Sequence, residues 1–252
     1  MDQPALLYTR YLPTATVTAS DTFAGTAAAD VLHATEDTFW RPADQSGDKT
    51  LTFDFGAART LSRLGLLGNN LDGCVVELRA SNDAFAAEDV LLAEAVILSA
   101  LANAASVAFD PADWRYARLT FKDGFIPSHL RLAWACWGRP AIVPYLEEDF
   151  DPESLTAEGE HLVSRQGIYL GSERERTMRT FTLNFGQVTE SEFTLLRSWI
   201  DDCIGRLNPF FFFPQHTAAA CYFCWTAEPK FSAPLRNGLR EVAAVRLLTR
   251  AI

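Results

Sequence analysis

The sequence predicts a mainly β protein, in which an antiparallel β-sandwich is followed by a smaller α+β domain with one amphipathic helix. Short stretches of alternating apolar and polar residues, bounded by turn-forming residues, recur from residue 14 to about residue 137. The clearest amphipathic helix pattern covers residues 189–207. Many short strands without alternating helices are typical of antiparallel sandwiches rather than of parallel α/β folds.

The first half contains most of the strand patterns. In residues 50–56, the side chains of Leu51, Phe53 and Phe55 share one face and a glycine ends the run, which predicts a half-buried strand. Residues 89–104 also fit a helical period, so their secondary structure stays open. The strand alternation is found again in residues 61–67, 74–80, 115–121 and 128–137.

The second half opens with a strand pattern in residues 179–186, which leads into the helix. Thr189 and Glu192 have the spacing of a capping box, in which each side chain accepts a hydrogen bond from the other residue's backbone. Apolar residues follow at three- and four-residue intervals until Asn208 and a proline stop the helix. Two further strands are predicted over residues 221–226 and 239–249.

Four consecutive aromatic residues lie between two prolines directly after this helix. A strand buried on both faces explains them, and so does an aromatic ridge that a second subunit covers in a homo-oligomer. A domain of about 90 residues has limited room to bury so many rings, so both interpretations stay open. The four residues are Phe210, Phe211, Phe212 and Phe213.

The 252-residue chain has a net charge of −10, and this charge is distributed unevenly along the sequence. Residues 1–146 carry −6, residues 147–164 carry −7 and residues 165–252 carry +3. A run of acidic residues is better solvated than buried, so we interpret residues 147–164 as an acidic junction between a sandwich domain and a second domain. The overall acidity also argues against a nucleic acid partner, because a polyanion would be repelled.

The cysteine content and the hydropathy of the sequence indicate in which compartment the protein folds and whether it inserts into a membrane. Five cysteines, an odd number, without a secretory signal before them predict reduced thiols in a protein folded in the cytoplasm. No apolar run approaches the ~20 residues of a membrane-spanning helix, so no membrane insertion is expected.

The sequence contains no recognised motif for catalysis or for a cofactor. The four histidines lie outside known catalytic motifs, and the glycines form no phosphate-binding pattern, so no catalytic residue and no cofactor is predicted. Cys221 and Cys224 have the spacing of half a zinc site. In a strand, however, residues three apart point to opposite faces, so we expect two buried thiols and no metal.

The order of motifs in the first half resembles discoidin-like (galactose-binding-like) jelly-roll domains. A loop with Ala-Thr-Glu-Asp-Thr-Phe-Trp-Arg-Pro at residues 34–42 precedes a strand that ends in Asp-Phe-Gly at residues 54–56. Leu-Ser-Arg-Leu-Gly-Leu-Leu at residues 61–67 and an Ala-Ser-Asn-Asp turn at residues 80–83 follow. The resemblance covers about 125 residues and implies a jelly roll that binds a glycan or a lipid head group through loops at one end.

That resemblance implies a glycan site made of four residues. Trp40 would stack on a sugar ring, and Arg41, Asn69 and Asn70 would bond its hydroxyl groups. The alternatives are that Trp40 belongs to the core and that the two asparagines form a turn.

Many members of that family also hold a structural calcium ion near the opening strand. Glu36 and Asp37 are the acidic residues of the matching loop. Calcium takes 6–8 oxygen ligands, and two carboxylates do not complete such a cage, so no metal is predicted.

The second half resembles the small β-sheet-plus-helix domain of tailed-phage tail-tip proteins, such as distal or minor tail proteins. The shared features are the strand ending in an aromatic residue and glycine, the capped helix with Trp199, the aromatic segment 210–213 and a last strand rich in arginine and valine. The resemblance covers about 85–90 residues and implies an assembly domain that contacts copies of itself and other tail proteins.

These resemblances together predict a non-enzymatic structural protein of a phage or prophage tail tip. It would fold in the host cytoplasm, oligomerise, link the tail tube to the baseplate hub and aid attachment through a host-surface glycan. A stand-alone carbohydrate-binding module for adhesion is the alternative from a different class, and a glycosidase is the third hypothesis.

Overall fold

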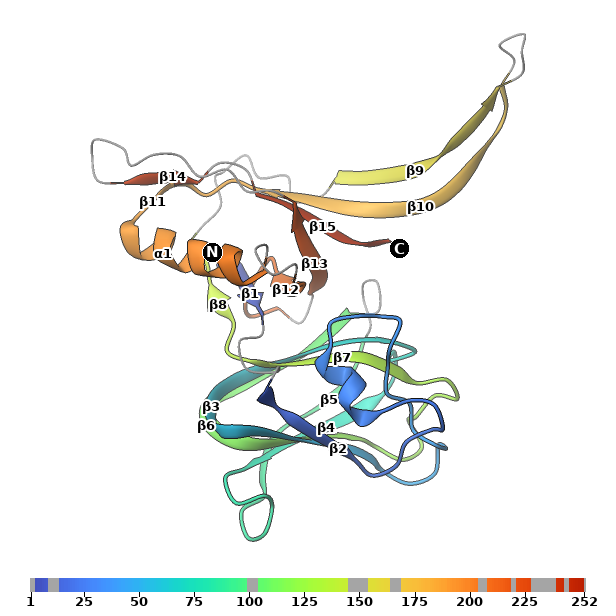
Figure 1. Cartoon of the computed structure of the whole chain (residues 1–252), viewed down its shortest axis with the longest axis vertical. Coiled ribbons are helices and arrows are strands. Elements are labelled where there is room, and N and C mark those ends of the chain that lie inside the picture. The colour runs from blue at the N-terminus through green and yellow to red at the C-terminus, as the bar shows by residue number, and fades with distance from the viewer. Residues whose placement is uncertain are drawn as a thin grey trace. The chain divides into compact units, whose positions relative to one another are not determined.

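The computed structural model describes residues 3–8, 14–98, 104–144, 154–163, 169–203, 208–218, 221–227, 239–242 and 245–251. The chain forms two compact units. The first consists of Met1–Ile142 and Phe210–Tyr222, and the second of Val143–Pro209 and Phe223–Ile252. The protein is mainly β with antiparallel sheets, as the sequence predicts (Figure 1).

The first unit is a β-sandwich whose main sheet has the strand order β2-β3-β6-β4-β5, with β7 paired to β3. Residues 90–96 form a strand, which decides the ambiguity between helix and strand in that part of the sequence. A short 3-10 helix, Ala28–Leu32, lies between the first two strands of this sheet. The strands are β2 (Thr16–Ala19), β3 (Lys49–Asn69), β4 (Val75–Ser81), β5 (Val90–Val96), β6 (Ala104–Phe121) and β7 (Arg131–Gly138).

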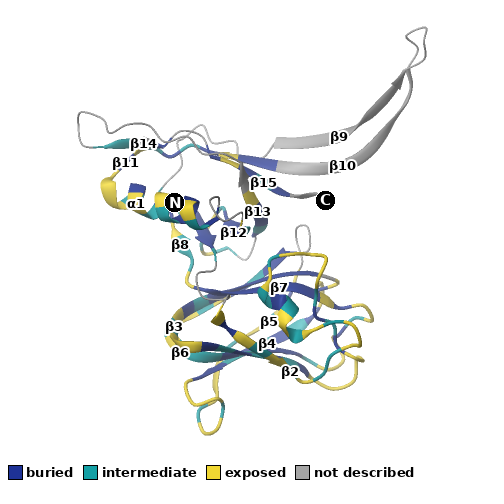
Figure 2. Cartoon of the chain, viewed as in Figure 1, coloured by how far each residue is buried: buried dark blue, intermediate teal, exposed yellow. Residues whose placement is uncertain are grey.

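Two long strands, β3 and β6, connect the layers of this sandwich. Residues 51–54 of β3 pair with β2, whereas residues 63–69 of the same strand pair with β7. Between these parts Gly56 has a φ of +75°, a conformation that glycine adopts without strain, and the register with β6 shifts. The rings of Phe53 and Trp137 then meet edge to face at 5.7 Å in the core. Figure 2 shows buried residues along these strands and exposed residues in the loops.

The phenylalanine segment forms strand β12 (Phe210–Phe213) and belongs to the first unit. It pairs with β1 (Ala5–Leu7), which pairs on its other side with β8 (Ala141–Ile142). All four phenylalanines are fully buried, and the Phe211 ring stacks on Trp134 at 5.0 Å. The structure therefore places Phe210, Phe211, Phe212 and Phe213 in a core, which leaves no exposed ring for the subunit interface considered above. It also assigns them to a different unit from residues 165–209, because the partner strand comes from the N-terminal end of the chain.

The second unit contains a sheet in which β13, β15, β10 and β9 are neighbours in that order. Strand β9 corrects the interpretation of residues 147–164 as a junction, since residues 154–163 pair with β10 over a long antiparallel ladder. A smaller pair is formed by β11 and β14. The strands are β9 (Ser154–Val163), β10 (Tyr169–Leu183), β11 (Gly186–Val188), β13 (Tyr222–Ala227), β14 (Arg240–Val242) and β15 (Val245–Ala251).

The helix α1 (Glu190–Cys203) begins as the sequence predicts. The backbone N–H of Thr189 donates to the Glu192 carboxylate at 2.8 Å, and the backbone N–H of Glu192 donates to the Thr189 hydroxyl at 3.4 Å. The end of the predicted helix, residues 204–207, lies outside the described residues. The apolar face of α1 is buried, including Leu196 and Trp199.

The structure also describes the cysteines, possible clusters of metal ligands and the lengths of the helices. All five cysteines are buried free thiols. No group of three or more metal-ligating side chains gathers anywhere in the described residues. Among the helices of the described residues, none has the length and apolar character needed to cross a membrane.

Candidate binding site

The structure corrects the prediction that Trp40 stacks on a sugar. The Trp40 side chain is fully buried, with its ring stacked on Phe121 at a centroid distance of 6.0 Å. Its indole N–H donates to the carbonyl of Asp21 at 3.0 Å, and its backbone exchanges two 2.9 Å hydrogen bonds with Leu132. Trp40 is thus a core residue that fastens its loop to the sandwich, and no face of its ring is open to a ligand.

Arg41 and Asn70, two other residues of the predicted glycan site, each contact a neighbouring segment of the protein. The Arg41 guanidinium lies 4.3 Å from the centroid of the Phe23 ring, and Arg41 is half-buried. Asn70 has a φ of +60°, and its side-chain amide donates to the carbonyl of His129 at 3.2 Å, so it acts as a turn residue. Asn69 lies at the end of β3, and its side chain is outside the described residues.

The acidic loops at this end of the sandwich are held by a lysine. Lys49 is nearly buried, and its ammonium donates to Asp21 at 2.5 Å and to Asp44 at 2.6 Å. Burial alone would lower the pKa of Lys49, but the two carboxylates outweigh it and raise this pKa. Hydrogen bonds from Lys49 and Ser46 lower the pKa of Asp44 to about 2. Glu36 and Asp37, the calcium candidates, are both exposed in the neighbouring loop.

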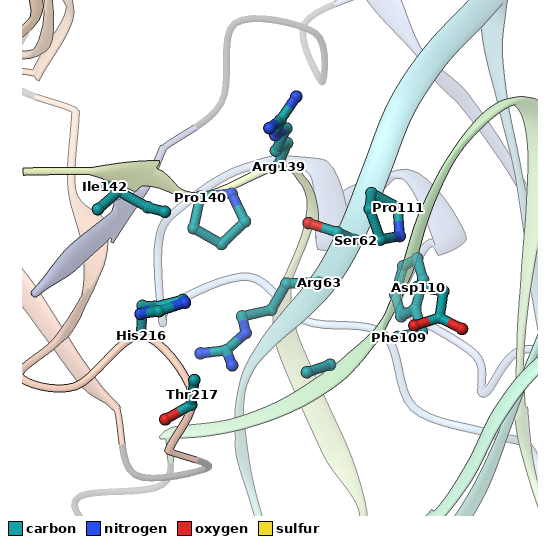
Figure 3. Close-up of a pocket in the computed structure, with 11 residues that line it drawn as sticks. Ser62, Arg63, Phe109, Asp110, Pro111, Arg139, Pro140, Ile142, His216 and Thr217 are labelled. Carbon is teal, nitrogen blue, oxygen red and sulfur yellow. The ribbon is translucent and has the colours of Figure 1, made fainter. Parts of the chain in front are cut away.

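An open pocket of about 570 Å³ lies elsewhere in the first unit (Figure 3). Its walls come from four segments that are far apart in the sequence. These segments are residues 62–63 of β3, residues 108–111 of β6, residues 139–142 after β7, and residues 216–217 after β12.

A bulge in β6 forms one wall of this pocket. Leu61 pairs with Ala112 and Arg63 pairs with Ala108, so Ser62 alone faces the three residues 109–111. The third of these is a proline, which has no N–H to give to the strand ladder. The extra residues therefore leave the ladder, as in a β-bulge, and contribute Phe109 and Asp110 to the pocket.

Arg63 lies against the opposite wall. It is only 3% exposed, and its guanidinium donates to the carbonyl of Ala218 at 3.3 Å. The same guanidinium lies 4.3 Å from the centroid of the Phe213 ring, a favourable position for a cation over an aromatic face. The backbone N–H of His216 donates to the carbonyl of Gln3 at 2.9 Å, which holds the loop after β12 in place.

Phe109, Arg139 and Asp110 are among the side chains of this pocket that a ligand can reach. Phe109 is half-buried, and its ring is steadied against Trp137 at a centroid distance of 6.1 Å. Arg139 and Asp110 are exposed, and within the described residues neither makes a hydrogen bond or an ion pair. An aromatic face, a guanidinium and a carboxylate around one hollow are suited to a polar ring compound with an apolar face.

Sequence reasoning missed this pocket, because its walls meet only when β12 joins the sandwich. Arg63 lies within the predicted strand at residues 61–67, whereas Phe109 and His216 lie outside the predicted strands. One local signal was present: Phe-Asp-Pro at residues 109–111 comes shortly before the predicted strand at residues 115–121, and a proline next to a strand is typical of an edge or a bulge.

No family model and no curated protein matches this chain. Similar solved structures include chitosan-binding module 1 of a chitosanase/glucanase from Paenibacillus sp. IK-5, at 17% identity and a TM-score of 0.45, covering 52% of this chain and 100% of the other. The family 32 CBM of NanJ from C. perfringens, solved in complex with galactose, has 19% identity and a TM-score of 0.44, covering 53% of this chain and 98% of the other. The CBM32 of AlyQ, solved with 4,5-unsaturated mannuronic acid, has 22% identity and a TM-score of 0.41, covering 48% of this chain and 92% of the other. These structures lend no support to the tail-tip resemblance of the second half, which stays a prediction.

Proposed function

We propose that the first unit is a carbohydrate-binding module, and that the pocket beside the β6 bulge receives a saccharide. The observation that carries this proposal is the gathering of Phe109, Arg139 and Asp110 around one open hollow of about 570 Å³. Pockets that bind small molecules have volumes of about 300–1,000 Å³, so the size is suitable.

The chemistry of the pocket fits a sugar ring. A pyranose presents C–H groups on one face and hydroxyl groups around its edge. The half-buried Phe109 ring offers an apolar surface that is already fixed by Trp137, so little side-chain entropy is lost on binding. Arg139 donates and Asp110 accepts hydrogen bonds, and together they satisfy hydroxyl groups of either polarity.

We propose binding without catalysis. Glycoside hydrolases generally use a pair of carboxyl groups on either side of the scissile bond. Among the described residues that line this pocket, Asp110 is the one carboxylate. A glycosidase at this site would need a second acid, so a binding role is the simpler proposal.

The proposal is tested by glycan-array binding of the full chain and of Phe109→Ala. Loss of the apolar platform is expected to weaken binding to the glycans that the wild type retains by about fivefold, since stacking on an aromatic ring contributes about 1 kcal/mol. Phe125→Ala is the matched control, because Phe125 is 55% exposed in a loop outside the pocket. Equal binding by the wild type and Phe109→Ala, or an array without any bound glycan, contradicts the proposal.

A further inference from the structure

The charge of the pocket differs from that of the chain around it. The chain has a net charge of −10, whereas the pocket is lined by two arginines and one aspartate. Clefts lined mainly by one sign of charge concentrate ligands of the opposite sign. A ligand that enters this hollow therefore meets a locally positive surface on an acidic protein.

Arg139 is placed to hold an anionic group. It follows β7 directly, and its neighbour Gly138 pairs with Arg63 in the ladder between β7 and β3. The two arginines thus come from adjacent positions of neighbouring strands. Arg139 is exposed and makes no hydrogen bond or ion pair within the described part of the chain. Its planar guanidinium matches a carboxylate with two parallel hydrogen bonds, which gives geometric selectivity as well as affinity.

Arg63 adds a second positive charge to the pocket, and contacts with neighbouring residues hold its side chain in place. Its guanidinium is fixed by the Ala218 carbonyl and by the face of the Phe213 ring. Because Arg63 is nearly buried, its charge is screened less by solvent than that of a surface arginine. Figure 3 shows Arg63 reaching toward His216 and Thr217 on one side of the hollow.

Asp110 lies on the other side of the hollow, in the β6 bulge (Figure 3). It forms no ion pair with either arginine, so it neutralises neither of them directly. The Asp110 carboxylate is therefore left to accept hydrogen bonds from hydroxyl groups of the ligand.

We propose that the pocket selects saccharides that carry a carboxylate, such as uronic acid residues, over neutral saccharides. The inference rests on the proposed function and names the ligand class of the same site. Arg139 pairs with the ligand carboxylate, Arg63 supplies a fixed positive charge behind it, and Phe109 packs against the ring.

The test compares trigalacturonate with its fully methyl-esterified form, using calorimetry on the full chain. The two ligands share a backbone, but the ester lacks the negative charge. We expect the acid to bind at least tenfold more tightly than the ester, with an affinity that falls as salt is added. Arg139→Gln is expected to weaken binding of the acid about tenfold and binding of the ester by a clearly smaller factor, because only the acid loses a charge partner.

Arg197→Gln is the matched control, because it makes the same charge change on the exposed side of α1, in the second unit. A loss of affinity for the acid in this variant equal to that of Arg139→Gln overturns the inference, since the effect would then come from net charge alone. Equal binding of acid and ester by the wild type also overturns the inference and leaves the proposed function standing. Binding of neither ligand, together with an array without any bound glycan, overturns the proposed function itself.

Discussion

At the scale of single residues, the loops at one end of the sandwich depend on a nearly buried lysine. The side chain of Lys49 is 5% exposed and donates to two carboxylates from different loop segments. Asp21 also accepts a hydrogen bond from the backbone N–H of Ala43, and its carbonyl accepts one from the Trp40 indole. One ammonium therefore ties together the loop that carries Trp40 and the strand that follows it.

Replacing this lysine tests its role directly. Lys49→Met keeps most of the apolar stem but leaves the Asp21 and Asp44 carboxylates without their cation. We expect it to lower the free energy of unfolding by about 1–2 kcal/mol, because the hydrogen bonds of a nearly buried ammonium are lost while both carboxylates remain partly exposed to solvent. Urea denaturation followed by tryptophan fluorescence measures the loss. Lys122→Met is the control, since the Lys122 side chain is 34% exposed and pairs with an exposed Asp48, and an equal loss in both variants would contradict the account.

At the scale of elements, the Phe211 ring of β12 packs directly on Gly65 of β3 and leaves no room for a side chain at that position. A Cβ atom placed at Gly65 of β3 would lie 2.5 Å from the Phe211 ring, which is closer than side chains pack. Glycine at this position lets the ring lie flat on Trp134, with an interplanar angle of 10°. The position of the Phe211 ring on the sandwich thus depends on the glycine at position 65 of β3.

A double-mutant cycle tests this contact. Gly65→Ala is expected to lower the free energy of unfolding by about 1–3 kcal/mol, because an added methyl group in a packed core forces the ring to shift. Phe211→Leu removes the clash at its own cost in stability. In the double variant the Gly65→Ala change should cost clearly less, which chemical denaturation of the four proteins measures. Strict additivity of the two changes would mean that Gly65 and Phe211 are not coupled.

The elements also show what the sequence could and could not predict. Local signals were sufficient for α1, where the capping box of Thr189 and Glu192 determines the first turn, and for the first part of β3. They failed for residues 154–163, because seven acids in residues 147–164 suggested a linker although part of this segment pairs as β9. For Trp40 they left a sugar platform and a core position both open, and contacts from segments distant in sequence place the ring in the core.

At the scale of the whole molecule, the first unit is discontinuous in sequence. Along the sequence, residues 143–209 belong to the second unit, and residues 210–222 belong to the first unit again. The pairing of β12 with β1 joins residues about 200 positions apart, and no local pattern indicates such a contact. Local sequence patterns could not predict the pocket either. The loop that carries His216 forms part of its wall, and this loop is placed there by the pairing of β12 with β1.

This organisation predicts that the sandwich is incomplete without its late strand. A fragment of residues 1–142 lacks β12, which leaves Trp134 uncovered and β1 without one of its two partner strands. We expect this fragment to bind the apolar dye ANS and to unfold at a clearly lower urea concentration than the same unit in the full chain. Addition of a peptide of residues 208–218 should reverse part of this effect, whereas a scrambled peptide should not. A fragment as stable as the full chain would contradict the assignment of β12 to the first unit.

In the function proposed above, the pocket holds the saccharide, and the loop end around Trp40 does not. Backbone amide shifts in an NMR titration of the full chain with trigalacturonate test it most directly. We expect the shifts to concentrate at residues 62–63, 108–111, 139–142 and 216–217, the four segments that line the pocket. Shifts confined to the loops that carry Trp40, Arg41, Asn69 and Asn70 would show that the saccharide binds at the site that the sequence predicted and not in the pocket.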